Sequence, residues 1–125
     1  MNSEEIELVE LAALAVGYTT SISRAYAGAQ VDIIAYGVDD YTYGIEWNPL
    51  VNDGDALQLA TTLKLSISFE QRNQHEWTHI VWVNPYFEPL VGDIYAATRR
   101  AIVRAAAHIG QQIRDSNEAT NVNQV

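Results

Sequence analysis

The chain has no cysteine and few basic residues. Without cysteine it has no disulfide, thiolate nucleophile or thiolate metal ligand, which excludes a small scaffold held together by disulfides. Its 125 residues, 48% of them hydrophobic, suffice for one self-stabilised core and are too few for two ordinary domains. We therefore expect a single domain at residues 1–114, followed by a flexible polar tail at residues 115–125.

Long apolar runs and a secretory leader are also missing. No stretch approaches the roughly 18 to 20 uninterrupted apolar residues that a membrane span requires. The first segment, MNSEEIELVELAALAVG, carries glutamates where a signal peptide has basic residues. Both observations favour a cytoplasmic protein.

Basic residues are scarce and unevenly distributed. The net charge of −9 comes from 16 acidic and 7 basic residues, and it makes direct binding of a nucleic-acid backbone unfavourable. Four of the basic residues are arginines near the end of the chain: Arg99, Arg100, Arg104 and Arg114. Two interpretations stay open, since these arginines either pair with acids of the same molecule or form an anion-binding face.

Two of the expected helices lie near the ends of the chain. Asn2 and Glu5 have the spacing of a capping box, which predicts a helix at residues 3–16. Asp93 is a suitable cap for a last, alanine-rich helix, and Gly110 is its expected stop.

A third helix is expected in the middle of the chain. Trp47 and Pro49 end a strand, and Asn52 or Asp53 then caps a helix that runs to Lys64. Its predicted buried stripe consists of Ala56, Leu57, Leu59, Ala60 and Leu63.

Two groups of strands are expected between the helices. The β-branched and aromatic runs TTSISRAY, QVDIIAYG and YTYGIEW predict strands within residues 18–47, with a hairpin turn at residues 38–40. Leu65, Ile67 and Phe69 alternate with polar residues, which indicates a strand with one buried face. The turn QRNQHE should connect it to a central strand, WTHIVWV, and a loop is expected at residues 85–89.

Three segments together resemble the phage ABA sandwich family, which comprises small bacteriophage and prophage proteins. The segments are ELVELAALAVGY, WNPLVNDGDALQLATTLKL and DIYAATRRAIVRAAAHIG, and the resemblance covers most of residues 5–110. It implies an α+β fold, specifically an α/β/α sandwich with a mainly antiparallel sheet of four or five strands and three helices. It also implies a phage accessory role in the host cytoplasm, and it assigns no catalytic residue.

The candidate metal ligands have simpler structural explanations. Asn52, Asp53 and Asp55 lack the alternation and terminal glutamate of an EF-hand loop, so helix capping is the better interpretation. In HEWTH, the second histidine, His79, follows His75 one residue too early for an HExxH zinc site, and the segment favours a strand. We expect no metal site, no catalytic site and no cofactor.

The leading hypothesis is a non-enzymatic binding protein that acts alone or as a homo-oligomer. Its partner would be a host or phage protein, or a small nucleotide signal that it sequesters. For a nucleotide, the expected ligand-binding residues are Arg99, Arg100 and Arg104 for phosphate and Tyr43 and Trp47 for the base. Two alternatives stay open: a small metal-dependent hydrolase that uses Asp53, Asp55 and a histidine, and an acidic mimic of DNA.

Overall fold

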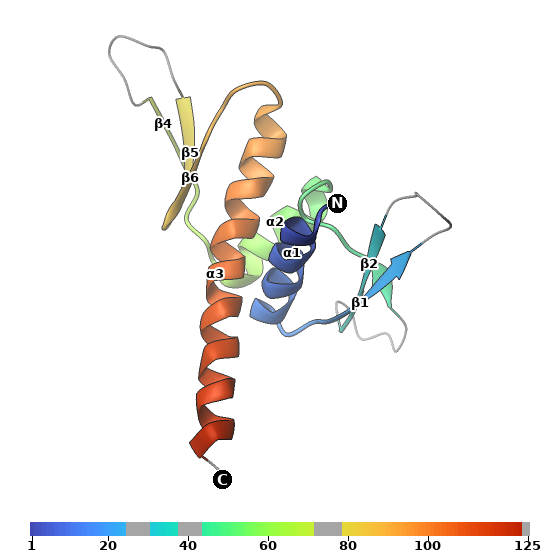
Figure 1. The fold of residues 1–125 in the computed structure, drawn as a ribbon. Helices are drawn as coiled ribbons and strands as arrows, with labels where there is room; N and C mark the ends of the chain where they lie inside the picture. The colour runs from blue at the N-terminus through green and yellow to red at the C-terminus, as the bar shows by residue number, and fades with distance from the viewer. Residues whose placement is uncertain (25–30, 38–43, 72–78, 124–125) are drawn as a thin grey trace.

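The computed structural model describes residues 1–24, 31–37, 44–71 and 79–123 (Figure 1). This part of the chain has three helices and six strands, with three strands between each helix and the next. They are α1 (Ser3–Ala15), β1 (Thr19–Arg24), β2 (Val31–Tyr36), β3 (Ile45–Glu46), α2 (Asp53–Leu63), β4 (Ser68–Gln71), β5 (His79–Val83), β6 (Tyr86–Pro89) and α3 (Ile94–Asn123). Among the helices described, none is long and apolar enough to cross a membrane.

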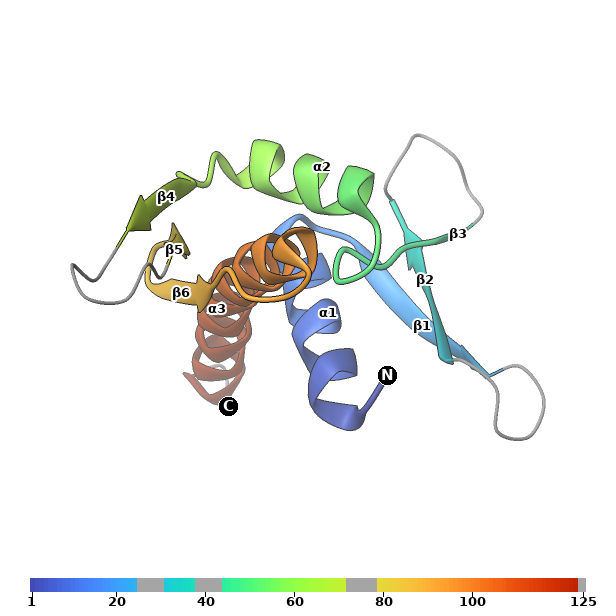
Figure 2. The same ribbon diagram turned by 90° about the horizontal axis from the view of Figure 1, so that it is seen from above.

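The strands form two separate antiparallel sheets, with the orders β1-β2-β3 and β4-β5-β6. The predicted α+β class, the antiparallel pairing and the central position of β5 are therefore confirmed. The two hairpin turns expected at residues 38–40 and 71–76 fall largely or wholly outside the described residues. The sheets lie on opposite sides of the helices (Figures 1 and 2), so the layers differ from one sheet of four or five strands between helices.

The first helix begins as its sequence predicts. The Asn2 side-chain oxygen accepts a hydrogen bond from the Glu5 amide at 2.8 Å, and the Asn2 amide donates to the Glu5 carboxylate at 3.2 Å. This capping box satisfies amides that would otherwise lack a partner in the first turn. The helix then buries Val9, Ala12 and Ala13 and packs along α3.

Gly110 was expected to end the last helix, but it does not. The helix continues to Asn123, so residues 115–123, expected as a flexible tail, are helical. Position 110 is glycine because two backbones approach closely there: a Cβ atom would lie 2.7 Å from the Leu11 carbonyl carbon and closer still to its oxygen. Gly110 therefore marks the crossing point of α1 and α3.

The segment around Trp47 connects the first sheet to α2, as its sequence predicts. Trp47 is only 1% exposed and contacts the Tyr18 ring edge-to-face, with 5.5 Å between ring centroids. Pro49 is also fully buried. These two residues fix the direction in which the chain leaves β3 and enters the turn before α2.

Two expectations about buried apolar residues and one about a loop were wrong. Leu57 is 65% exposed, whereas Leu59 on the other side of α2 is buried. Phe69, which was expected on a buried face, lies on the edge strand β4 and is 61% exposed. Residues 86–89 are not a loop: they form β6, which pairs with β5.

We predict that Gly110→Ala destabilises the protein by about 1 to 3 kcal/mol, because the added methyl group overlaps the α1 backbone. In an exposed helix the same change usually stabilises by about 1 kcal/mol, so the sign of the effect is diagnostic. Urea denaturation measures it, with Gln112→Ala at an exposed site of α3 as the control. A stabilised Gly110→Ala variant would show that the two helices do not cross here.

Candidate functional site

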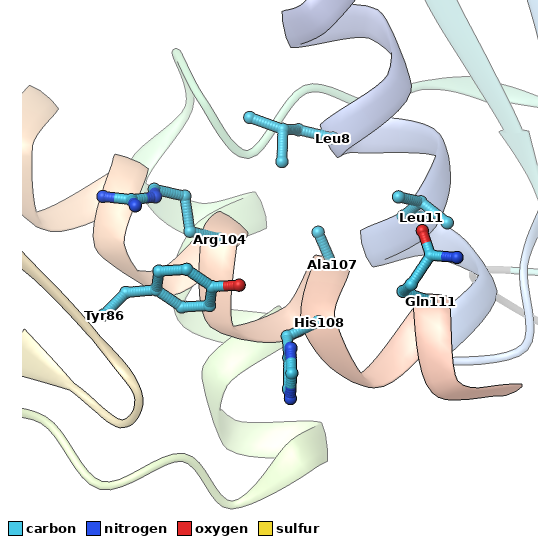
Figure 3. Close-up of a pocket in the computed structure, with 7 residues that line it drawn as sticks. All are labelled: Leu8, Leu11, Tyr86, Arg104, Ala107, His108 and Gln111. Carbon is cyan, nitrogen blue, oxygen red and sulfur yellow. The ribbon is translucent and has the colours of Figure 1, made fainter.

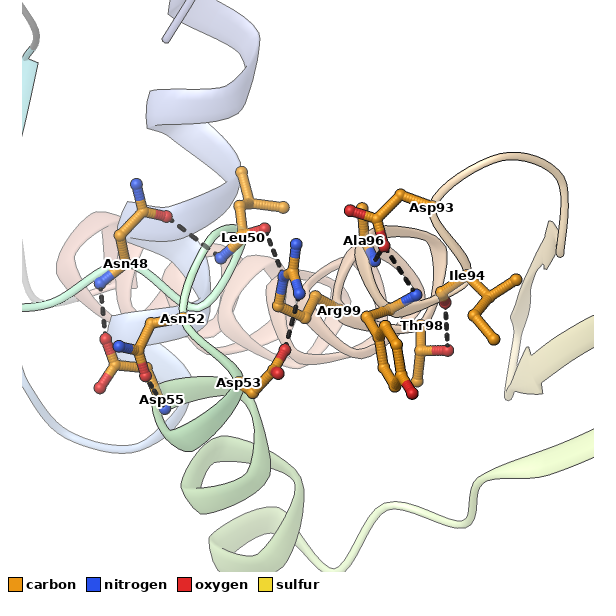
Figure 4. A network of polar contacts seen from close by, with 11 residues as sticks. Asn48, Leu50, Asn52, Asp53, Asp55, Asp93, Ile94, Ala96, Thr98 and Arg99 are labelled. Atoms are coloured by element: carbon orange, nitrogen blue, oxygen red, sulfur yellow. Dashed lines mark hydrogen bonds and ion pairs between the residues drawn. The ribbon is translucent and has the colours of Figure 1, made fainter.

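Arg99 connects α3 to the start of α2 (Figure 4). Its Nη1 lies 2.6 Å from Asp53 Oδ1, and its Nε donates to the Leu50 carbonyl oxygen at 2.8 Å. The Arg99 side chain is 15% exposed and that of Asp53 is 72% exposed. Arg99 thus has a structural role, and its guanidinium already has two partners.

The polar residues before α2 are engaged in the turn itself (Figure 4). The Asn52 side chain caps α2 by accepting from the Asp55 amide at 2.9 Å, and Asp55 Oδ2 accepts from the Asn48 amide at 2.9 Å. Capping at Asn52 is therefore confirmed. Within the described ranges, no three histidine, aspartate or glutamate side chains gather in a way that could hold a metal ion.

Arg100 and Arg104 share one carboxylate. Glu88 Oε1 on β6 lies 3.3 Å from Arg100 Nε and 2.9 Å from Arg104 Nη1. The Arg104 guanidinium also lies over the Tyr86 ring, 4.5 Å from its centroid. Two cations on one anion leave a positive balance at this position, although each guanidinium already has a partner.

A small pocket adjoins Arg104 on the face between α1 and α3 (Figure 3). It has a volume of about 210 Å³ and is lined by Leu8, Leu11, Tyr86, Arg104, Ala107, His108 and Gln111. The His108 ring contacts Tyr86 edge-on, with 6.0 Å between centroids. The pocket therefore combines an apolar floor with one cation and several hydrogen-bonding groups.

Of the two aromatic residues expected to stack on a base, Trp47 is not brought to these arginines. Trp47 lies in the core, where a ligand could reach it only if the core opened. Tyr43 and His75 lie outside the described residues. His79 begins β5 and is exposed, and no carboxylate pair joins it in the described part of the chain.

A second, larger cavity than the pocket at Arg104 is an apolar groove between α2, β4 and the first turns of α3. We call it the α2–α3 groove; its volume is about 590 Å³. Its lining residues are Asp53, Ala56, Leu57, Ile67, Phe69, Leu90, Ile94, Tyr95, Thr98, Arg99 and Ile102. Leu57, Phe69, Ile94 and Tyr95 are all substantially exposed around it, with Tyr95 at 66%.

Sequence reasoning missed this groove, although one signal for it was present. Leu57 and Leu59 are two residues apart, which separates them by about 200° around a helix, so they cannot share one buried face. Ile94 and Tyr95 are likewise apolar residues ahead of the regularly spaced alanines that α3 buries. Surplus apolar residues at helix positions that face away from the core indicate a second apolar surface.

We predict that Arg99→Ala destabilises the protein more than Asp53→Ala does. The exposed ion pair contributes about 0 to 1 kcal/mol, whereas loss of the charged donor to the partly buried Leu50 carbonyl adds about 1 to 3 kcal/mol. Urea denaturation of both variants and of Arg100→Ala, which removes a more exposed arginine from α3, tests this order. Equal effects of Arg99→Ala and Asp53→Ala would show that the bond to Leu50 contributes nothing.

Comparisons with known proteins add no family. No protein-family model, curated protein or solved structure matches this chain. The functional argument therefore depends on the described surfaces and on the sequence resemblance.

Proposed function

We propose that this protein is a non-enzymatic binding protein that recognises a protein partner through the α2–α3 groove. The observation that carries the proposal is the exposure of Leu57, Phe69, Ile94 and Tyr95 around one apolar cavity. Contiguous exposed apolar patches of this kind mark interaction sites, because a folded chain otherwise gains by covering them. Occlusion of a host or phage protein is the activity that such a surface supports.

The polar groups of the groove suit binding better than catalysis. Asp53 and Arg99 are paired with each other, and Thr98 Oγ1 donates to the Ile94 carbonyl oxygen at 2.8 Å. General acid–base or nucleophilic chemistry requires a reactive group aligned with a second one and directed at substrate. The groove offers apolar contacts instead, with its polar groups at its margin.

The biological setting proposed here comes from the sequence resemblance. A member of the phage ABA sandwich family would act as an accessory protein in the host cytoplasm, alone or as an oligomer. Interference with a host process by covering a protein surface agrees with both the resemblance and the groove.

We predict that a photo-crosslinking phenylalanine analogue at position 95 captures a discrete host or phage protein from infected-cell extract. Excess unlabelled protein should compete for capture, and Leu57→Glu should reduce it at least tenfold while leaving the circular dichroism spectrum unchanged. The control is the same analogue at position 10, an exposed site on α1, which should not capture the protein that position 95 captures. If Leu57→Glu leaves capture unaffected, the groove is not the binding surface.

The sequestration of a small nucleotide is the second candidate, and the pocket at Arg104 is the observation that favours it. A guanidinium over the Tyr86 ring, with His108 and Gln111 nearby, provides groups that bind phosphate and a planar ring. Its 210 Å³ is below the roughly 300 to 1,000 Å³ of most ligand pockets. A nucleotide would also have to compete with Glu88 for both arginines.

For this second function, calorimetry with cyclic and linear nucleotides should show binding that weakens as salt increases. Arg104→Ala should weaken it at least tenfold, because Arg104 lines the pocket, whereas Arg114→Ala should change it less than twofold. Arg100→Ala should fall between the two, because Arg100 shares Glu88 but lies outside the pocket. No binding by the parent, or equal binding by all variants, would remove the nucleotide hypothesis.

A further inference from the structure

We propose that the occupant of the α2–α3 groove is one amphipathic α-helix of another protein, with basic residues on its polar side. This inference rests on the proposed function, since it names the partner that the groove recognises. Three properties of the groove lead to it: its helical walls, its apolar lining with only a short strand edge beside it, and its exposed carboxylates.

The walls of the groove have the spacing that receives a helix. From α2 come Asp53 and, three and four residues later, Ala56 and Leu57; from α3 come Ile94, Thr98 and Ile102 at intervals of four residues. Such rows form ridges between which the side chains of a third helix pack. Apolar residues at positions i, i+3, i+4 and i+7 of a partner helix would then fill the cavity.

The hydrogen bonding of the groove favours a helix over an extended peptide. A helix satisfies its own amides and carbonyls, whereas an extended peptide in an apolar groove leaves many of them unpaired, at a cost for each. Strand β4 is at the edge of its sheet, but at four residues it could pair with only a short part of a peptide. The polar side chains Thr98 and Arg99 are already bonded within the protein.

The charge around the groove favours a basic partner. Two exposed carboxylates lie at the groove: Asp53 is in the lining, where it pairs with Arg99, and Asp93 precedes Ile94 and caps α3. The Asp53 side chain is 72% exposed and that of Arg99 only 15%, so the negative partner of the pair faces solvent. The basic Lys64 caps the opposite end of α2. A second copy of the chain would bring the same carboxylates and another net charge of −9, which opposes self-association.

The test uses a synthetic peptide about 18 residues long, enough to form a helix, with leucines at i, i+3, i+4 and i+7 and lysines elsewhere. One matched peptide has glutamates in place of the lysines, and a second has the lysine peptide's composition in scrambled order. Fluorescence anisotropy should show that the lysine peptide binds at least tenfold more tightly than either control. Leu57→Glu should weaken binding at least tenfold, and Ile22→Glu, at an exposed site of the first sheet, should not.

The other outcomes separate the inference from the proposed function. If position 95 captures a protein in a Leu57-dependent manner but the lysine peptide binds no better than its controls, the helix inference is wrong and the binding function stands. Equal affinity of lysine and glutamate peptides would overturn the charge preference. A dimer in sedimentation equilibrium that Leu57→Glu dissociates would identify a second copy as the occupant and overturn the inference.

Discussion

The close approach of α1 and α3 at Gly110 is the constraint on which the rest of the architecture depends. A hydrogen atom in place of a side chain lets the Leu11 carbonyl lie against the α3 backbone, and Ala12, Ala13 and Ala106 continue the contact with small side chains. The helices then form a shared central layer, and each sheet packs against it from one side. Both sheets contribute buried residues to this core, Ile33 and Ala35 from the first sheet and Val81 and Val83 from the second.

This arrangement gives the faces of α3 different uses. Ala101 and Ala105 are buried in the core, and the face that bears Arg100 and Arg104 meets the Glu88 carboxylate of β6. The first turns of α3, beyond the contact with α1, carry exposed apolar residues along the groove (Figure 1). One helix therefore contributes its middle turns to the core and carries exposed apolar residues near its start.

The sequence predicted what short-range chemistry determines. The caps at Asn2 and Asn52 could be read because their partners lie within three residues. The role of Gly110 could not be predicted, because Leu11, which it contacts, lies about one hundred residues earlier in the chain. A glycine after alanines is also the usual helix stop. The pairing of Arg100 and Arg104 with Glu88 depends on β6, a strand hidden in a segment with two prolines that resembled a loop. The surplus apolar residues of α2 and α3 could be recognised in the sequence, but no local pattern shows that the fold brings them together around one groove.

The crossing at Gly110 also has a consequence for the order in which the protein folds during synthesis. Each of the four strand pairs joins neighbours in the sequence, so these pairs can form soon after they leave the ribosome. The apolar face of α1, however, is covered only after α3, the last described helix, has been synthesised. Until then the α1 side chains that will meet α3 are exposed in the nascent chain, which makes this interval the period of greatest risk for aggregation and for capture by chaperones.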